Sequence, residues 1–244
     1  MKTEAIVASA GSGRRLKARV SKPYLEIAGK PILIHTLQAL NRSPKVHTII
    51  VVVNRRQVPR CARLVERYKV KKVKGVVAGG RERSDSVYNG LKALDPDTQI
   101  VLIHDGVRPF VTPDIIGKAV DCAARFGACV VAVPVKATIK KLKAQRSKVK
   151  TVESTVDRSN LWEIQTPQVF KKDVIVQAYK RFKNIPATDD AMLVERLGVP
   201  VKIVAGSYKN IKITTLDDLV IGEAILKTQI SKLKSQNCNS KLKT

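Results

Sequence analysis

Short runs of consecutive apolar residues alternate along the chain with longer segments in which apolar residues recur every three or four positions. A short uninterrupted run is typical of a strand buried on both faces of a sheet, and the longer spacing is typical of a helix with one buried face. The apolar runs predict strands at residues 5–9, 48–53, 74–78, 100–104 and 129–134. The helical spacing predicts helices at residues 32–41, 58–68, 84–94, 113–126, 172–182, 189–197 and 216–229.

The order of these elements, with helices between successive strands, determines the expected fold class. Strands that are joined by helices run parallel, and the helices then cover both faces of the sheet. We therefore expect an α/β fold with a Rossmann-like, mostly parallel sheet and helices on both faces. In sheets of this kind ligands bind at the carboxyl ends of the strands, so candidate chemistry is expected in the segments that follow the strands.

One segment, residues 135–162, does not fit the alternation of strands and helices. It contains short alternating runs on either side of a polar, basic centre at residues 144–148, a pattern typical of an extended hairpin. We expect residues 1–230 to form a single domain from which this segment projects as a β-arm. Residues 231–244 form a basic tail that we expect to be frayed.

The charge balance is unusual for a chain of 244 residues. Lysine and arginine number 46 against 20 acidic residues, which gives a formal net charge of +26. Such a surface favours anionic partners, and a basic nucleic-acid-binding module is one interpretation. Aromatic residues make up only 4% of the chain, which leaves few side chains to stack on bases. Nucleic acid is therefore not the main partner that we expect.

The remaining composition favours a cytoplasmic protein. The four cysteines are scattered, none forms a Cys-x-x-Cys pair, and the three histidines have no metal-ligand spacing. No apolar run approaches the roughly 20 residues that a membrane span needs. We expect a cytoplasmic setting, without disulfides, a zinc site or a membrane partner.

The first expected strand runs into a glycine turn, Ala10-Gly11-Ser12-Gly13, and a strongly basic segment follows it. Glycine lets successive backbone N–H groups point toward a ligand, and such a turn forms an anion-binding nest. The spacing does not fit the dinucleotide fingerprint, since Leu16 stands where a third glycine is needed, and no Gly-Lys-Ser or Gly-Lys-Thr follows. The turn and its basic flank, which includes Arg15 and Lys22, favour a polyanionic ligand such as a triphosphate.

Two later segments carry further candidates, each directly after an expected strand. Residues 79–91 form a second glycine turn that opens a helix, in which Ser84 is positioned to cap the free N–H groups. Asp105 follows the fourth expected strand, where its carboxylate can hold a divalent metal ion. A salt bridge to Arg108 is the alternative interpretation of Asp105, and the residues leave both open.

These segments and several later ones occur in the order and spacing of a known enzyme family. They are residues 8–15 (ASAGSGRR), 21–25 (SKPYL), Gly80 with Arg83 and Ser86, 104–110 (HDGVRPF), Asp157 with Arg158, 165–168 (QTPQ) and 210–214 (NIKIT). From about residue 5 to residue 229 the chain resembles the 2-C-methyl-D-erythritol 4-phosphate cytidylyltransferases, a family of sugar-phosphate nucleotidyltransferases.

The resemblance implies a reaction and a role for each matching residue. The reaction is the transfer of a cytidylyl group from CTP to methylerythritol phosphate, with release of pyrophosphate, in isoprenoid precursor synthesis. The implied catalytic residues are Arg15 and Lys22. The implied nucleotide site comprises Ala10, Gly11, Gly13, Gly80, Arg83, Ser86 and Asp105. The residues implied to position the sugar phosphate are Arg158, Lys212, Thr138 and Thr188.

The resemblance also implies a cofactor and a partner. The cofactor is Mg²⁺ or a similar divalent cation, with Asp105 as its ligand. The partner is a second copy of the chain, in a homodimer whose subunits exchange their arms. The residue types agree with this chemistry, because a phosphate acceptor is already an anion and needs positioning and charge neutralisation rather than a protein nucleophile.

Some residues depart from the family pattern, and more than one function fits the motifs. Pro23 directly follows Lys22, Lys209 stands where relatives often carry an acidic residue, and Arg81 stands where they sometimes do. The nearest alternative is a ribitol-5-phosphate cytidylyltransferase, which shares most of these motifs. A nucleic-acid-binding module and a structural relative without activity are interpretations of a different class. The presence of Arg15, Lys22, Arg158 and Lys212 argues against an inactive relative.

Overall fold

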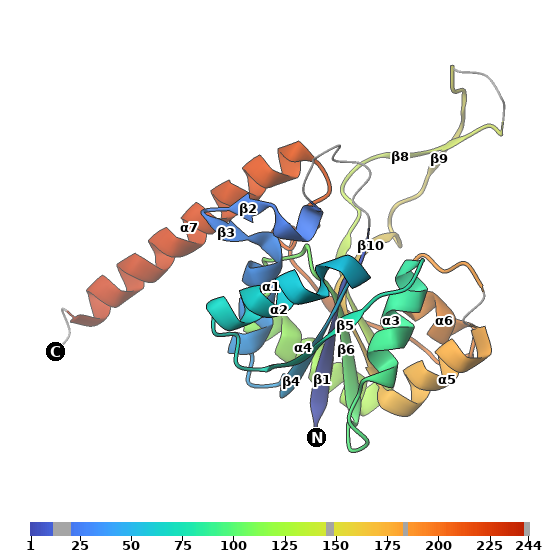
Figure 1. Cartoon of the computed structure of the whole chain (residues 1–244). Coiled ribbons are helices and arrows are strands. Elements are labelled where there is room, and N and C mark those ends of the chain that lie inside the picture. Colours follow the sequence, from blue (N-terminus) through green and yellow to red (C-terminus); the bar gives the residue numbers. More distant parts are fainter. Residues whose placement is uncertain (12–20, 145–148, 183–184, 242–244) are drawn as a thin grey trace.

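The computed structural model of the chain describes residues 1–11, 21–144, 149–182 and 185–241. Its main feature is a seven-stranded sheet with the order β11-β7-β10-β6-β1-β4-β5. The strands are β1 (Thr3–Ser9), β4 (Thr48–Val53), β5 (Val73–Ala78), β6 (Ile100–Asp105), β7 (Ala128–Pro134), β10 (Trp162–Lys171) and β11 (Lys202–Ala205). All of them run parallel except β10, which is antiparallel to its neighbours β6 and β7. The expected Rossmann-like, mostly parallel sheet is thus confirmed (Figure 1).

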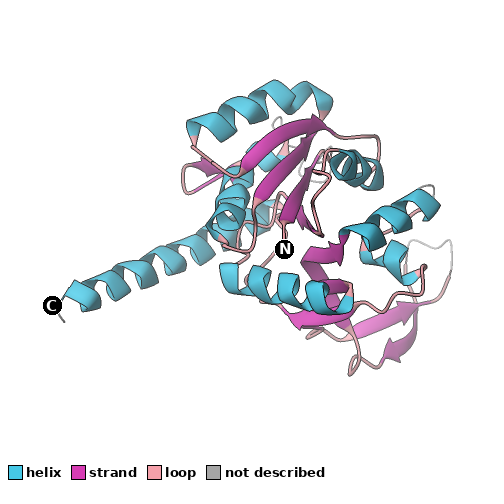
Figure 2. Cartoon of the chain, turned by 90° about the horizontal axis from the view of Figure 1, so that it is seen from below, coloured by secondary structure: helices cyan, strands magenta, loops and turns pink. Residues whose placement is uncertain are grey.

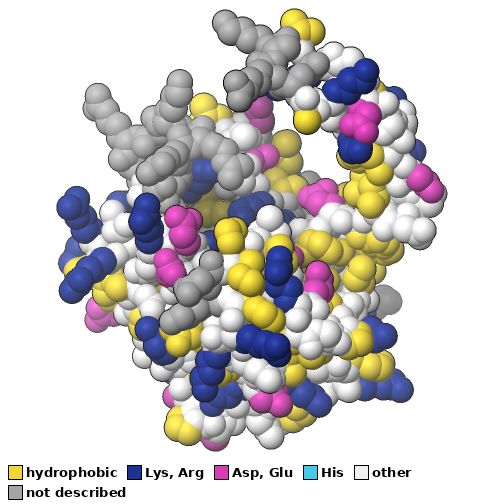
Figure 3. Space-filling model, turned by 90° about the vertical axis from the view of Figure 1, so that its right-hand side faces the viewer, with side chains coloured by type: hydrophobic (Ala, Val, Ile, Leu, Met, Phe, Trp, Pro, Cys, Tyr) yellow, Lys and Arg dark blue, Asp and Glu magenta, His cyan; other side chains and the backbone are white. Residues whose placement is uncertain are grey.

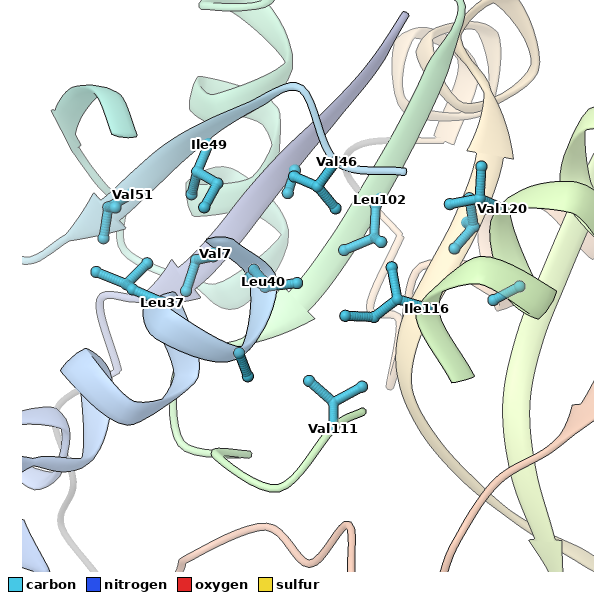
Figure 4. Close-up of a cluster of buried hydrophobic side chains, with 14 of the residues drawn as sticks. Val7, Leu37, Leu40, Val46, Ile49, Val51, Leu102, Val111, Ile116 and Val120 are labelled. Atoms are coloured by element: carbon cyan, nitrogen blue, oxygen red, sulfur yellow. The ribbon is translucent and has the colours of Figure 1, made fainter. Parts of the chain in front are cut away.

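Helices cover both faces of this sheet (Figure 2). One face is covered by α1 (Ile32–Arg42), α2 (Val58–Arg67) and α4 (Pro113–Phe126), and the other by α3 (Arg83–Lys92), α5 (Lys172–Phe182) and α6 (Ala191–Glu195). On the first face Leu37, Leu40 and Ile116 of the helices pack with Val7 and Leu102 of β1 and β6 (Figure 4). All five side chains are fully buried, and burying one such side chain contributes about 2 kcal/mol. The helices thereby fix the two strands whose carboxyl ends carry the candidate site.

The strands and helices expected from the apolar pattern are all present, and the ends of the five strands lie within two residues of their expected positions. The pattern missed β10 and β11, and also the two-residue strands β2 (Glu26–Ile27) and β3 (Lys30–Pro31), which form a small hairpin. In β10 the polar residues Gln165, Thr166 and Gln168 interrupt the apolar run. They are nonetheless buried, because each forms hydrogen bonds inside the protein.

Residues 135–162, which we call the arm, form the expected hairpin. β8 (Ile139–Leu142) pairs antiparallel with β9 (Val152–Val156), and residues 145–148 between them lie outside the described residues. Figure 1 shows the two strands extending away from the body of the molecule. Five large apolar side chains in the described part of the arm are exposed, namely Ile139, Leu142, Val149, Val152 and Trp162. The shape of the arm is confirmed, and its exchange in a dimer stays a prediction.

The last helix, α7 (Leu216–Lys241), is longer than the apolar pattern predicts. No glycine or proline follows Gly222 within it, so the sequence contains no residue that would end the helix earlier. Helix therefore occupies most of the segment that we expected to be a frayed tail. Near the body, Leu226 of α7 packs in one cluster with Phe110 and Ile213. In the described part of the chain, no helix is long and apolar enough to cross a membrane.

Candidate active site

A cavity of about 630 Å³ lies at the carboxyl ends of β1 and β6, where ligands bind in sheets of this kind. These ends meet because the parallel register places Ala8 of β1 beside Asp105 of β6. The lining is completed by the turn before α3, the 3-10 turn η2 (Lys22–Tyr24), Asn54, Val107 and residues 212–214. The predicted site residues that line the cavity are Ala10, Gly11, Lys22, Gly80, Arg83, Ser86, Asp105 and Lys212.

The turn before α3 packs closely against the start of the first glycine turn. A Cβ on Gly79 would lie 2.4 Å from the Cβ of Ala10, a distance that no side chain could adopt. Ser86 Oγ accepts a hydrogen bond from the Gly80 N–H at 3.1 Å and donates one to the carbonyl of Glu82 at 3.0 Å. The backbone of the second turn is therefore fixed on the cavity wall, next to the backbone of the first.

The first turn of α3 corrects one detail of the sequence analysis. The N-cap residue is Glu82 rather than Ser84, and the helix begins at Arg83. Glu82 and Asp85 form a capping box, in which Asp85 Oδ2 accepts a hydrogen bond from the Glu82 N–H at 3.0 Å. The prediction for Ser84 was wrong because two carboxylates, which are stronger acceptors than a hydroxyl, are available at this helix end.

Asp105 lies within a cluster of cations that borders the cavity. Its Oδ2 is 2.8 Å from Lys212 Nζ and 3.5 Å from Arg108 Nε, and its Oδ1 is 3.7 Å from Arg83 Nε. Burial alone would raise the pKa of Asp105, but the three cations hold this pKa well below its ordinary value. The salt bridge between Asp105 and Arg108, the alternative interpretation from the sequence, is therefore present. Three cations around one carboxylate also leave a net positive charge, which favours the binding of phosphate groups.

Arg83 is held from its other side by Asp190, a residue that the sequence analysis did not identify. The two side chains form parallel hydrogen bonds of 3.0 and 2.7 Å, and Asp190 also accepts one from the Tyr179 hydroxyl at 2.6 Å. Burial and the neighbouring Asp190 carboxylate raise the pKa of Tyr179, so its hydroxyl stays protonated and remains a donor. The sequence signal was ambiguous, since an aspartate at the start of an expected helix is more simply interpreted as a cap.

Lys22 approaches the cavity from the segment that precedes α1. Its Nζ donates a hydrogen bond to the carbonyl of Thr214 at 2.9 Å. Asp218 fixes this partner, because its Oδ2 accepts hydrogen bonds from the N–H groups of Thr214 and Thr215 at 2.7 and 2.8 Å. Pro23, the departure from the family pattern, lies in the first turn of η2, a position to which its restricted φ is suited. Lys22 thus lies beside the same 212–214 segment that carries Lys212.

The other predicted site residues are not found among the described residues that line this cavity. The described residues that line it do not include Arg158, Thr138 or Thr188. Arg158 and Thr138 are exposed on the arm, and the Arg158 guanidinium donates to the carbonyl of Lys136. Thr188 is exposed in the segment before α6. Two predicted residues, Gly13 and Arg15, lie outside the described residues.

Several residues of the cavity wall were not predicted from the sequence. These are Ala8, Ser9, Pro23, Asn54, Arg81, Glu82, Val107, Ile213 and Thr214. Asn54 had a usable signal, because it directly follows β4, and the carboxyl ends of β4 and β1 lie side by side in the parallel register. Its side chain caps the turn that follows β4, accepting a hydrogen bond from the Arg56 N–H at 3.0 Å.

The donor set around Asp105 limits how a metal ion could bind. Across the described residues, no group of three carboxylate, histidine or cysteine side chains is placed to hold one. Mg²⁺ in nucleotide enzymes is usually held by one or two carboxylates together with phosphate oxygens of the substrate. Asp105 fits this second arrangement, and its Oδ1 is the less occupied oxygen because its cation contact is 3.7 Å long.

Comparison with known proteins identifies the family. A family model described as 2-C-methyl-D-erythritol 4-phosphate cytidylyltransferase matches residues 3–228. The chain belongs to this family. A relative of that name from Pelotomaculum thermopropionicum is 48% identical over 236 residues, which cover 95% of this chain and 97% of the relative. Another member from Geobacillus kaustophilus is 45% identical and is covered over its whole length, with 95% of this chain.

Solved structures of the family agree in fold. The 4-diphosphocytidyl-2C-methyl-D-erythritol synthase of Anaerococcus prevotii matches with a TM-score of 0.81 and 33% identity, over 93% of this chain and 96% of that one. The 2-C-methyl-D-erythritol 4-phosphate cytidylyltransferase of Thermus thermophilus matches with a TM-score of 0.76 and 29% identity, over 93% and 100% of the two chains. The sheet and helices described above are therefore those of this cytidylyltransferase family.

Proposed function

We propose that this protein transfers a cytidylyl group from CTP to 2-C-methyl-D-erythritol 4-phosphate. A phosphate oxygen of the acceptor attacks the α-phosphorus of CTP, and the bond from that phosphorus to the oxygen bridging to the β-phosphate breaks. The products are 4-diphosphocytidyl-2-C-methyl-D-erythritol and pyrophosphate. The observation that carries this proposal is the cation cluster around Asp105, which borders a cavity at the strand ends of a chain in this family.

The cations of the cavity reduce the main obstacle to this reaction, which is the electrostatic repulsion between two anionic substrates. Two like charges 4 Å apart repel by about 4 kcal/mol at an effective dielectric constant of about 20. Lys22 and Lys212 both line the cavity and can offset this repulsion. We assign Lys22 and Arg15 to the charge that develops on the phosphates in the transition state, and Lys212 to the acceptor phosphate.

The nucleotide half of the site consists mainly of backbone. We assign it to Ala10, Gly11, Gly13, Gly80 and Ser86, with Arg83 and Asp105 at its edge. The close approach of Gly79 to Ala10 brings the two glycine turns together, so the nucleotide meets a preformed wall. Arg83 borders this wall with its guanidinium already oriented by Asp190.

Asp105 would hold the divalent cation together with phosphate oxygens of CTP. When bound, Mg²⁺ offsets negative charge on the nucleotide phosphates and on the departing pyrophosphate. Lys212 and Arg108 keep Asp105 ionised and oriented. Both substrates are charged phosphates that do not cross membranes unaided, which supports a cytoplasmic setting.

We also propose that the active form is a homodimer in which the arm of one subunit completes the cavity of the other. The arm extends from the body with apolar side chains on its surface (Figure 3), and an isolated hairpin of this size is marginal in water. Arg158 and Thr138 are exposed on this arm and lie outside the cavity of their own chain. A twofold contact would bring them, with Thr188, to the sugar phosphate.

The experiment is an assay of pyrophosphate release from CTP with a panel of polyol phosphates. We expect turnover with methylerythritol phosphate, and loss of turnover in excess EDTA. Faster turnover of ribitol 5-phosphate would reassign the acceptor, and no turnover of any acceptor would remove the proposed function. Undiminished turnover in excess EDTA would remove the metal role of Asp105.

A further inference from the structure

Four buried residues beside the cavity are joined in a closed ring of hydrogen bonds. Arg108 Nη1 donates to the carbonyl of Asn210, and Asn210 Nδ2 donates to the carbonyl of Thr166, both at 2.9 Å. Thr166 Oγ1 lies 3.0 Å from His104 Nδ1, and His104 Nε2 lies 3.0 Å from the carbonyl of Arg108. We call these four residues the ring. None of them is more than 8% exposed.

The direction of the remaining bonds follows from the chemistry of His104. A carbonyl oxygen only accepts, so His104 Nε2 carries the proton in its bond to Arg108. A fully buried imidazole whose Nε2 carries the proton accepts at its other nitrogen, so His104 Nδ1 accepts the hydrogen bond from Thr166. Thr166 Oγ1 in turn accepts a hydrogen bond from the Asp105 N–H at 3.1 Å. The donor and the acceptor are therefore defined for each of the four bonds of the ring.

The ring is attached to both members of the Asp105–Lys212 pair. Asp105 directly follows His104 in β6, and its N–H is bonded to Thr166. Lys212 lies two residues after Asn210, whose side chain is fully buried and bonded to β10 through Gln165 and Thr166. The described residues that line the cavity include Asp105 and Lys212 but none of the four ring residues. The ring can therefore affect a substrate only through neighbouring residues, and Asp105 and Lys212 are the charged ones among them.

We propose that the ring sets the position of Lys212 relative to Asp105, and that Asn210 is a positioning residue for cytidylyl transfer. This inference rests on the proposed function, which identifies the substrates that Asp105 and Lys212 contact. Removing a buried amide leaves its former partners without hydrogen bonds, so we expect the backbone of residues 210–212, which carries Lys212, to shift. A displacement of about 1 Å in a substrate-contacting group can lower a rate by about 10²-fold.

A double-mutant cycle with Asn210→Ala and Lys212→Met tests this proposal. We expect Asn210→Ala alone to lower kcat/KM for methylerythritol phosphate by about tenfold or more. In the Lys212→Met background the same change should lower it by less than about twofold, because the group being positioned is gone. Equal losses in both backgrounds would overturn the proposal. Thr166→Val is the second variant if Asn210→Ala does not fold, and Thr166→Ser should restore the activity that Thr166→Val loses.

Two further measurements distinguish a positioning role of the ring from a general loss of stability, and from an error in the proposed substrate. Thr98→Val removes a buried hydroxyl that donates to Glu4 at 2.6 Å, at the opposite end of the sheet. It should lower Tm while leaving kcat/KM within about twofold of the wild-type value; a matching loss of activity would overturn the proposal. A crystal structure of Asn210→Ala tests the ring without any substrate. We expect Lys212 Nζ to lie outside hydrogen-bond reach of Asp105 in this structure. An unchanged distance between Lys212 and Asp105 would overturn the role of the ring, even if the proposed function failed.

Discussion

Arg83 and Asp190 form a two-point ion pair between residues that are 107 positions apart, with Nη1 3.0 Å from Oδ1 and Nη2 2.7 Å from Oδ2. Asp190 is fully buried, whereas the Arg83 side chain is 31% exposed and lines the cavity. The pair therefore joins the start of α6 to the first turn of α3. It also holds a cation of the site in one orientation before any substrate binds.

Asp190→Asn should lower the free energy of unfolding by about 3 kcal/mol, because Arg83 loses the closer of its two charged partners while remaining largely buried. Urea unfolding of both proteins measures this difference. Asp114→Asn is the matched control, since Asp114 pairs with Lys118 at 2.9 Å but both side chains are more than 60% exposed. This control should change the free energy by less than about 0.5 kcal/mol. A loss below about 1 kcal/mol for Asp190→Asn would show that the pair does not stabilise the fold.

The elements that could be predicted from the sequence are those whose signal is local. β4 (Thr48–Val53) is an unbroken apolar run, and α4 (Pro113–Phe126) has regular spacing between Thr112 as N-cap and Gly127 at its end. β10 could not be predicted, because its buried polar residues are stabilised by distant partners. Gln168, for example, accepts hydrogen bonds from the N–H groups of Asp190 and Ala191.

The same distinction applies to the candidate site. Gly11 and Asp105 could be predicted, because a parallel sheet brings the residues after its strands to one edge. Asn210 could be recognised from the sequence only as part of a family motif, since its proposed role depends on partners in β10 and after β6. Arg158 and Thr138 depend on the resemblance alone, because the site that they are proposed to complete belongs to another subunit.

Lys22→Ala should lower kcat by about 10²–10³-fold, the usual scale for the loss of one preorganised transition-state contact. Arg15→Ala should have an effect of similar size. Steady-state kinetics with CTP and methylerythritol phosphate measures both. Lys118→Ala removes an exposed lysine that pairs with Asp114 away from the cavity, and it should leave kcat unchanged. A near-normal kcat for Lys22→Ala would mean that Lys22 is only a structural contact to Thr214.

Arg158→Lys should raise KM for methylerythritol phosphate and leave CTP binding unchanged. Arginine can hold a phosphate with two parallel N–H donors, and lysine keeps the charge but loses this fork. The acceptor is followed by kinetics, and CTP is titrated by calorimetry. Weaker binding of CTP alone, or equal weakening of both substrates, would show that Arg158 belongs to the other half of the site.

Two inactive variants should complement each other if the arm completes a neighbouring subunit. Coexpressed Lys22→Ala and Arg158→Ala chains form mixed dimers in which one site of two has both wild-type residues. With random pairing this restores about a quarter of wild-type activity. Lys22→Ala with Lys212→Ala is the control, since both residues line the cavity of one chain and no mixed dimer contains an intact site. Activity no higher than that of the separate variants would contradict the exchange of arms.

Acid should destabilise the protein in a pH range set by His104. Burial lowers the pKa of this imidazole from 6.5 to about 4 in the folded protein. Above pH 6.5 His104 is neutral in both the folded and unfolded states, and its contribution to stability is complete. As the pH falls from 6.5 toward 4, the unfolded chain takes up a proton that the folded chain does not bind. The free energy of unfolding should therefore fall by up to about 3 kcal/mol over this range.

The measurement is the slope of the unfolding free energy against pH, from urea titrations of the wild type and His104→Gln. The variant is expected to be less stable at every pH, because it lacks part of the ring, so the slopes are compared rather than the absolute values. His35, which is partly buried and whose pKa is also lowered by burial, is present in both proteins and does not affect the difference. Between pH 6.5 and 4 the wild type should lose stability more steeply than His104→Gln. Parallel curves would mean that His104 is not a buried neutral imidazole, and Thr166 could then not donate to its Nδ1.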